Sequence, residues 1–440
     1  MSTSTTAHMT GASTGAVAHY QTALRQLQCY IEDPVASVDA ALAESPDFVM
    51  AHVLRAYLHL LGTEPPGIAV ARDNHAQAVR LGGAPWERAH VAAVGHLAAG
   101  RWHQAGRVLE DIAIEDPLDI LALQVGHQLD FFTGHSRMLR DRIVRAMPAW
   151  DRAMPAYHSV LGMLSFGLEE TGAYREAEAY GRRGVELQPR DGWAQHAVAH
   201  VLEMQGRQRD GIAWMTATPD AWSRDSFFAV HNWWHVALYH LELGEPDQAL
   251  ALFDGPIHRG TSQVVLDMID GAALLWRLHL RGIAVGDRWN AVADAWAPLA
   301  TAGNYAFNDM HAMMAFVGAG RTREAAALLD TQRSAMERDD DNAAFTREVG
   351  HPATRAIQAF GDGDWAKAVD LLRPIRSIAH RFGGSHAQRD LLDLTLIEAA
   401  FRAEQTSLAR ALTAERLAWK PDSPLSRLFA KRAGIAAAQA

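Results

Sequence analysis

The segment LEETGAYREAEAYGRRGVELQPRD, residues 168–191, decides the fold. It predicts one helix that ends at Gly172, a short turn, and a second helix that Pro189 closes. Glycine readily adopts the left-handed conformation that follows a helix, and proline cannot continue one. Ala177 is a small residue on the second helix that can face back toward the first. The segment therefore predicts an antiparallel helical hairpin.

The same turn recurs along the chain at intervals of 34 to 43 residues. An interval of 34 is the period of tetratricopeptide units, and the longer intervals fit the same unit with loop insertions. With residues 33–47 and 403–415, the pattern predicts an all-α, right-handed superhelical solenoid of about ten hairpins, whose first helices line a concave wall. The turn glycines are Gly62, Gly100, Gly134, Gly172, Gly206, Gly244, Gly286, Gly320 and Gly363.

Bulk composition narrows the class of partner. The chain has 440 residues, a formal net charge of −10 and a pI near 6.1, without a run of Lys or Arg. These properties argue against nucleic acid and anionic membranes as partners. A single cysteine, Cys29, rules out an intrachain disulfide and CxxC-type zinc sites. No apolar run reaches the length of a membrane span. We expect a disordered leader over 1–17, one solenoid domain over 18–440, and a cytoplasmic location.

Several histidines recur at similar distances before the turn glycines. His196, His200 and Glu203 form an H-x-x-x-H-x-x-E stripe on the first helix before Gly206. His231 and His235 lie in HNWWHVALYH (231–240), on the first helix of the next unit. Residues four apart share a helix face. We therefore expect these five side chains to lie together on the concave wall and to be the catalytic residues of any enzyme here.

Other residues on the expected wall are predicted to bind substrate. They lie in PAYHSVLGMLSFGLEE (155–170), in the helices before Gly206, Gly244 and Gly320, and in GGSHAQRD (383–390). Adjacent indoles point about 100° apart on a helix, so only one of the Trp233–Trp234 pair is expected to line a cavity. The predicted substrate-binding set is His158, Trp193, Trp234, Asn308, Asp309, His311, His386, Arg389 and Asp390.

The chain resembles the tetratricopeptide repeat protein 38 family. The resemblance is carried by YHSVLGMLSFGLEETGAY, WAQHAVAHVLEMQGR, HNWWHVALYHLELG, FNDMHAMMAFVGAGR and GGSHAQRD, over residues 115 to 395 or so. It implies the helical-repeat fold and little about chemistry, which is poorly defined in that family. The family's histidine-bearing blocks match here at His158, His196, His200, His231, His235, His311 and His386.

Two chemistries suit the histidine cluster. In the first, His196 or His231 acts as general acid or base, Glu203 orients it, and Arg389 holds an anionic group of a small molecule in a hydrolase or lyase reaction. No cofactor is needed for this interpretation, which we prefer on sequence grounds. In the second, His196, His200, His231 and His235 bind a divalent metal, although the H-E-x-x-H pattern is absent.

A non-enzymatic role is the alternative. Helical-repeat proteins of this kind bind extended peptides in their concave groove or build homo-oligomers. The expected wall carries many His and Trp residues and few Lys. That composition suits a small enclosed molecule better than a peptide terminus, but both alternatives stay open at this point.

Overall fold

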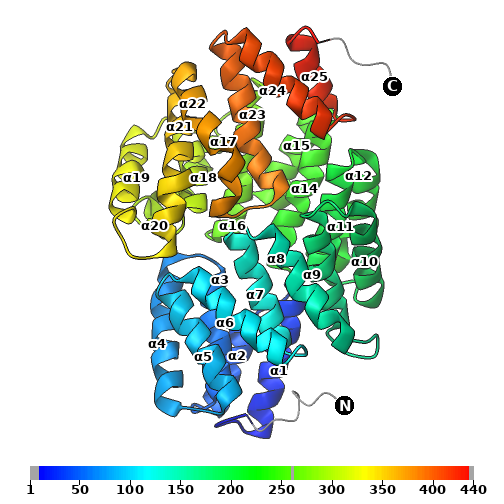
Figure 1. Cartoon of the computed structure of the whole chain (residues 1–440), viewed down its shortest axis with the longest axis vertical. Coiled ribbons are helices and arrows are strands. Elements are labelled where there is room, and N and C mark those ends of the chain that lie inside the picture. The colour runs from blue at the N-terminus through cyan, green and yellow to red at the C-terminus, as the bar shows by residue number, and fades with distance from the viewer. Residues whose placement is uncertain (1–8, 259–261, 436–440) are drawn as a thin grey trace. The chain divides into compact units, whose positions relative to one another are not determined.

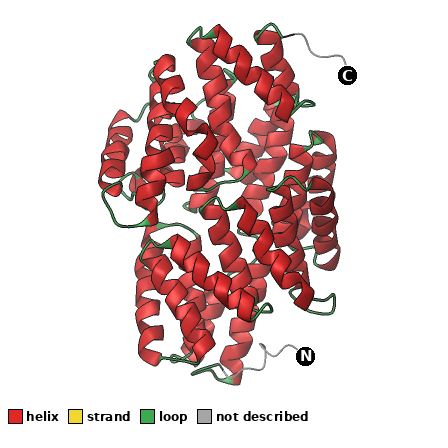
Figure 2. Cartoon of the chain, viewed as in Figure 1, coloured by secondary structure: helices red, strands yellow, loops and turns green. Residues whose placement is uncertain are grey.

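A computed structural model describes residues 9–258 and 262–435, and nearly all of them are helical (Figure 1, Figure 2). Within these residues no strand forms, and the single β-bridge joins Ile31 to Ser226. Consecutive helices pair as hairpins along the chain. The prediction of an all-α fold of tetratricopeptide-like hairpins is confirmed.

The chain divides into two compact units. Unit 1 comprises residues up to Val198 together with Thr218–Ala229, and unit 2 comprises Ala199–Ala217 and the chain from Val230 onward. The division passes through one continuous helix, α11 (Gly192–Met204). The predictions of one domain over 18–440 and of a right-handed superhelix stay predictions.

The hairpins of unit 1 come from its first ten helices, shown from blue to teal in Figure 1. Their bounds are α1 (Thr14–Cys29), α2 (Pro34–Glu44), α3 (Val49–Leu61), α4 (Pro65–Leu81), α5 (Pro85–Ala98), α6 (Trp102–Glu115), α7 (Ile120–Phe132), α8 (Ser136–Ala146), α9 (Tyr157–Glu169) and α10 (Tyr174–Leu187), with the short α13 (Pro219–Ser223) and the 3-10 turn η1 (Met147–Ala149).

Unit 2 continues the same arrangement with longer irregular insertions. Its further α-helices are α12 (Gln208–Thr216), α14 (Ala229–Glu242), α15 (Pro246–Leu252), α16 (Val265–Leu280), α17 (Arg288–Trp296), α18 (Ala306–Gly318), α19 (Thr322–Ala335), α20 (Asp341–Phe345), α21 (His351–Gly361), α22 (Trp365–Leu372), α23 (His386–Arg402), α24 (Thr406–Trp419) and α25 (Pro424–Arg432). The 3-10 and π segments are η2 (Phe253–Ile257), η3 (Ala297–Leu299), η4 (Thr346–Gly350) and η5 (Arg373–Phe382).

The segment that decides the fold forms α9 and α10 as expected. Gly172 has φ +82°, and Ala177 is fully buried in the hairpin. Seven further predicted turn glycines also have positive φ. At the first turn Gly62 stays right-handed at φ −70°, and Thr63 takes the left-handed conformation instead.

One turn lies earlier than the glycine spacing predicts. Helix α16 ends at Leu280, and Gly282 has φ +69° directly after it. Gly282 lies 38 residues after Gly244 and 38 before Gly320, so the structural repeat is more regular here than the prediction at Gly286. Gly286 also has positive φ, but it belongs to the loop before α17.

The boundary of the predicted leader needs correction. Helix α1 begins at Thr14, because the Ser13 side chain accepts a hydrogen bond from the Ala16 amide and caps the helix. Thr10 is also fixed, by hydrogen bonds from its amide and hydroxyl to Glu87. Residues 1–8 of the predicted leader lie outside the described residues.

Across the described helices, none combines the length and the apolar character needed to cross a bilayer.

Candidate functional site

The predicted histidine stripe is buried on α11 and α14. His200 and His235 have no exposed surface, and 4% of His231 remains exposed. Both helices are apolar on nearly all sides, because Ala, Val, Leu and Trp fill the positions between the histidines. A helix that is hydrophobic all round is a core helix, so its polar side chains must find partners inside the protein.

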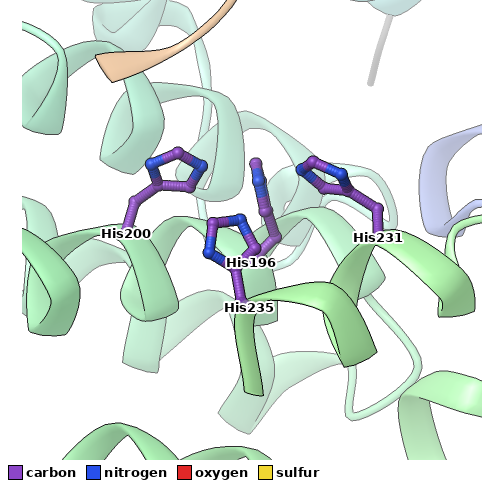
Figure 3. Close-up of side chains that lie close together, drawn as sticks. All are labelled: His196, His200, His231 and His235. Atoms are coloured by element: carbon purple, nitrogen blue, oxygen red, sulfur yellow. The ribbon is translucent and has the colours of Figure 1, made fainter. Parts of the chain in front are cut away.

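Four imidazole rings gather at this point (Figure 3). His196, His200, His231 and His235 each offer one ring nitrogen, and these four atoms lie within 4.8 Å of one another. Within unit 2 the ring centroids of His200 and His235 are 4.5 Å apart, and those of His231 and His235 are 5.0 Å apart. His196 belongs to the set through its place one turn before His200 on α11. The structure therefore groups the four predicted histidines.

Two of these rings are held by carboxylates. The Nδ1 atom of His231 lies 2.9 Å from Oδ2 of Asp270 on α16. The Nδ1 atom of His235 lies 3.3 Å from Oε2 of Glu203. A carboxylate only accepts hydrogen bonds, so the hydrogen of a neutral His231 ring sits on Nδ1. In a histidine held through Nδ1, Nε2 is the nitrogen that serves as a ligand or a base.

Burial favours the neutral form of His200 and His235. It places the pKa of His200 well below the ordinary value, and the neighbouring His235 and His231 lower it further. Burial also lowers the pKa of His235, although the contact with Glu203 opposes this. Near neutral pH the His200 and His235 rings are therefore uncharged.

Basic side chains stand beside the cluster within unit 2. Arg416 donates two hydrogen bonds, of 2.6 and 3.1 Å, to the Asp390 carboxylate. Lys420 Nζ lies 3.8 Å from Asp390 and 3.8 Å from Glu203. Arg416 and Lys420 hold the pKa of Asp390 well below its usual range, against the effect of burial. Asp390, predicted to touch substrate, is thus part of an ion-pair network.

His196 also packs into an aromatic group of unit 1. Its ring centroid lies 4.9 Å from that of Trp193, 5.4 Å from Phe166 and 5.1 Å from Phe228. Trp193 in turn stacks on Tyr30 at 5.6 Å. These contacts give Trp193 a place in the core of unit 1. Its predicted substrate contact stays a prediction.

The two indoles of HNWWH differ in burial, and the expectation that one of them lines a cavity stays a prediction. Trp234 is fully buried and stacks on His231 with centroids 5.4 Å apart and planes at 18°. Trp233 is half-buried. Trp234 therefore fixes one face of a cluster histidine.

His158 belongs to unit 1. Its Nδ1 atom lies 2.7 Å from Oδ2 of Asp191, the residue directly before α11. The same Asp191 carboxylate accepts the amide of Ala194 and so caps that helix. His158 has a carboxylate partner of the same kind as His231.

The predicted residues of α18 have partners of their own. Asp309 accepts a 3.3 Å hydrogen bond from Gln332 on α19, and burial raises its pKa to about 7. His311 Nδ1 lies 2.8 Å from the Phe307 carbonyl oxygen, and burial lowers its pKa to about 4. Asn308 is buried on the same helix.

The GGSHAQRD segment starts α23. His386 is its first residue and lies edge-on to Trp419, with centroids 6.5 Å apart. His386 is also close enough to lower the pKa of His200 by its charge. Arg389 donates to the Gly384 carbonyl of the preceding turn. An anion held by Arg389 stays a prediction.

Sequence reasoning missed Asp270, Arg277, Arg416 and Lys420. The first two lie in VLDMIDGAALLWRLHL, an apolar helix in which Asp270 and Arg277 are seven residues apart, two turns along one face. A charged residue inside such a run is a signal of a buried polar site, and it was available in the sequence. Arg416 and Lys420, by contrast, sit on an ordinary amphipathic helix end, where the sequence gives no such signal.

Comparison with known proteins adds little. No protein-family model matches the chain. Among solved structures, yeast Tom70 shares 12% identity over 96% of each chain, with a TM-score of 0.34. The structure of Naa15/Naa10 bound to HypK shares 11% sequence identity with the chain. The match covers 96% of this chain and 65% of that one, with a TM-score of 0.26. The TPR domain of P58(IPK) shares 14% sequence identity with the chain. The match covers 89% of this chain and 99% of that one, with a TM-score of 0.19. TM-scores this low decide nothing, and the resemblance to the tetratricopeptide repeat protein 38 family stays a prediction.

Proposed function

We propose that His200, His231 and His235 bind a divalent transition metal ion such as Zn²⁺. In this proposal the metal ion serves hydrolase or lyase chemistry on a small molecule. The observation that carries it is the carboxylate on Nδ1 of two of the three rings, Asp270 on His231 and Glu203 on His235. A metal-bound histidine commonly donates its other ring N–H to such a carboxylate, which fixes the ring and raises its basicity.

The charge balance supports a dication. Neutral imidazoles suit Zn²⁺, Cu²⁺, Ni²⁺ and related ions, and they bring no charge of their own. Asp270 is fully buried, and Glu203 lies in the same network. Two carboxylates behind the ligands offset the charge of one divalent ion. In tetrahedral zinc sites the ligand nitrogens are roughly 3.4 Å apart, and ring nitrogens of these histidines lie within 4.8 Å of one another before any metal is bound.

The low pKa values of His200 and His235 favour metal binding by these two rings over acid catalysis by them. A general acid near neutral pH needs a pKa near 7, whereas that of His200 lies well below 6.5. Metal ligands, in contrast, must be deprotonated. The same burial that weakens acid catalysis therefore suits coordination.

Three protein ligands leave a fourth position for water or substrate, which is the arrangement of catalytic zinc sites. A Zn²⁺ ion held by these residues would supply an activated water and a Lewis acid for a carbonyl or phosphoryl oxygen. His196, one turn from His200 on α11, would be the residue to exchange a proton there. If His196 binds the metal as well, the site is closed and structural.

A purely structural role is the competing interpretation, and one observation favours it. His90 pairs with Asp119 at 2.9 Å and His158 with Asp191 at 2.7 Å, both in unit 1. Histidine–aspartate pairs therefore also serve to join neighbouring hairpins. In that case the chain is a helical-repeat scaffold for a partner peptide or protein.

Metal content tests the proposal. After loading with Zn²⁺ and gel filtration, the wild-type chain should retain one equivalent, and His200→Ala and His235→Ala should lose it. His90→Ala, which removes a histidine–aspartate pair outside the cluster, should still retain one equivalent. A Co²⁺-loaded sample should show the intense visible bands of a tetrahedral site. Absence of retained metal in a folded wild-type chain would reject the proposal and favour the scaffold.

Replacing His196 separates the two forms of the site. We expect His196→Ala to keep its metal if the fourth position is open, and to lose affinity strongly if His196 is a ligand.

A further inference from the structure

Arg277 is a buried cation without a carboxylate partner. Only 6% of its surface is exposed, and its guanidinium donates to the Ala387 carbonyl. In the described part of the chain, its Nε–H has no hydrogen-bond acceptor and no carboxylate comes within ion-pair distance. A buried charge without a partner costs several kcal/mol, and burial lowers the pKa of Arg277 accordingly.

The nearest carboxylates are engaged by other cations. Asp390 accepts both hydrogen bonds of Arg416 and lies close to Lys420. Glu203 is shared between His235 and Lys420. Asp390 and Glu203 still act on Arg277 through their charge, but at longer range. Neither Asp390 nor Glu203 is therefore a direct partner of Arg277.

A second unused donor lies beside Arg277. The guanidinium carbon is 5.9 Å from the ring centroid of Trp234. Within the residues that the structure describes, the Trp234 Nε1–H has no acceptor. The same indole stacks on His231. Two buried donors without acceptors thus stand one aromatic ring away from the histidine cluster.

We infer that Arg277, with Trp234 Nε1–H, binds an oxyanionic group of the small-molecule substrate, a carboxylate or a phosphate. A planar guanidinium binds both groups through two parallel hydrogen bonds. The inference rests on the proposed function in that the anion is the handle of a molecule whose reacting group reaches the histidine cluster. Binding of the anion itself does not require the metal.

Thermal unfolding in the presence of simple anions tests the inference. The probes are sodium acetate and sodium phosphate, with sodium chloride at equal ionic strength as reference. Acetate, phosphate or both should raise the wild-type Tm above the chloride value, by roughly 1–2 °C at ten times the Kd. A response to acetate alone assigns a carboxylate, and a response to phosphate alone assigns a phosphate.

Two variants locate the effect. Arg277→Gln should raise the Tm measured in chloride, because it removes an uncompensated buried charge, and should weaken the anion response about tenfold or more. Arg277→Lys keeps the charge but loses the paired hydrogen bonds, so its response should be intermediate. Arg142→Gln is the matched control, since Arg142 is equally buried but ion-paired with Asp130 at 2.7 Å. It should lower the Tm and leave the anion response unchanged.

The inference is overturned if neither anion raises the wild-type Tm above chloride, or if Arg277→Gln responds like the wild type. It is also overturned if Arg277→Gln lowers the Tm as Arg142→Gln does, because Arg277 would then be structural. Zinc content measured on the same samples keeps the two proposals apart. A wild type that retains zinc but ignores both anions refutes only the anion site. A wild type that responds to anions but retains no zinc refutes only the metal site.

Discussion

His231 and Asp270 repeat, in unit 2, a contact that unit 1 makes between His158 and Asp191. In both pairs the histidine Nδ1 atom lies within 3 Å of a fully buried carboxylate, on α16 for Asp270 and directly before α11 for Asp191. What differs is the other side of the ring. His231 is grouped with further histidines, whereas His158 contacts Asp191 outside that group. In the proposed metal site, the contact between His231 and Asp270 would therefore also orient His231 as a metal ligand.

The first prediction concerns Asp270, the carboxylate that contacts His231. Asp270→Asn preserves shape and a hydrogen-bond acceptor but removes the charge that supports His231. Metal affinity should fall by about 10–100-fold, the usual effect of losing such a partner. Titration of the metal-free protein with Zn²⁺ against a competing chelator measures this.

Asp119→Asn is the control for this prediction, because Asp119 pairs with His90 at 2.9 Å in unit 1. It should alter stability without altering zinc affinity. Equal affinity in wild type and Asp270→Asn would mean that Asp270 serves hairpin packing alone.

Removal of the metal should destabilise the wild-type chain selectively. A metal bound only by the folded state stabilises it by RT ln(1 + [L]/Kd), which amounts to about 4 kcal/mol at a thousand times Kd. A strong chelator should therefore lower the Tm of the zinc-loaded wild type by several degrees. The Tm of His235→Ala should not respond to the chelator. A wild-type Tm that ignores both zinc and chelator would contradict the prediction.

The helical architecture could be predicted because it depends on local rules. A glycine with positive φ follows most of the first helices, as at Gly172 and Gly206, and this requirement is visible in the sequence. The exception at Gly62 arises because a neighbouring Thr63 accepts the strained conformation, which spacing alone does not reveal.

The histidine grouping was also predictable, since helical phase places His196, His200 and Glu203 on one stripe. Their partners were not. Glu203 pairs with His235 on the next first helix, and Asp270 reaches His231 across 39 residues of sequence. Lys420 arrives from α24, more than 200 residues after Glu203. Such contacts depend on how hairpins stack and coil, and small changes in loop length move them out of register with the sequence pattern.

The pH dependence of stability provides a prediction for His311. Burial lowers the pKa of His311 from 6.5 to about 4 in the folded chain. The unfolded chain therefore takes up a proton first as pH falls. The stability that this group contributes is complete above pH 6.5 and is lost as the pH falls toward 4. At pH 5 the loss is about 2 kcal/mol, at 1.4 kcal/mol for each unit of pKa.

His311→Asn removes this titration and can still donate to the Phe307 carbonyl. Urea unfolding at pH 7.5 and pH 5 should show a smaller pH-dependent loss in the variant than in the wild type, by about 2 kcal/mol. Identical losses in the two proteins would show that His311 is protonated in the folded chain.

Asp309 should behave in the opposite sense. Burial raises its pKa from 3.8 to about 7, so the folded chain holds the proton more tightly than the unfolded chain. The stability that the Asp309 carboxyl contributes is therefore complete below pH 3.8 and is lost as the pH rises toward 7. Asp309→Asn keeps the acceptor for Gln332 and removes the cost of ionisation. The variant should be more stable than the wild type by up to about 4 kcal/mol at pH 8, and by less than about 1 kcal/mol at pH 4.

Asp390→Asn is the matched control, since Asp390 is equally buried but paired with Arg416. It should destabilise the chain by about 3–5 kcal/mol at pH 8. If Asp309→Asn also destabilises at pH 8, Asp309 is ionised in the folded chain and has a cationic partner.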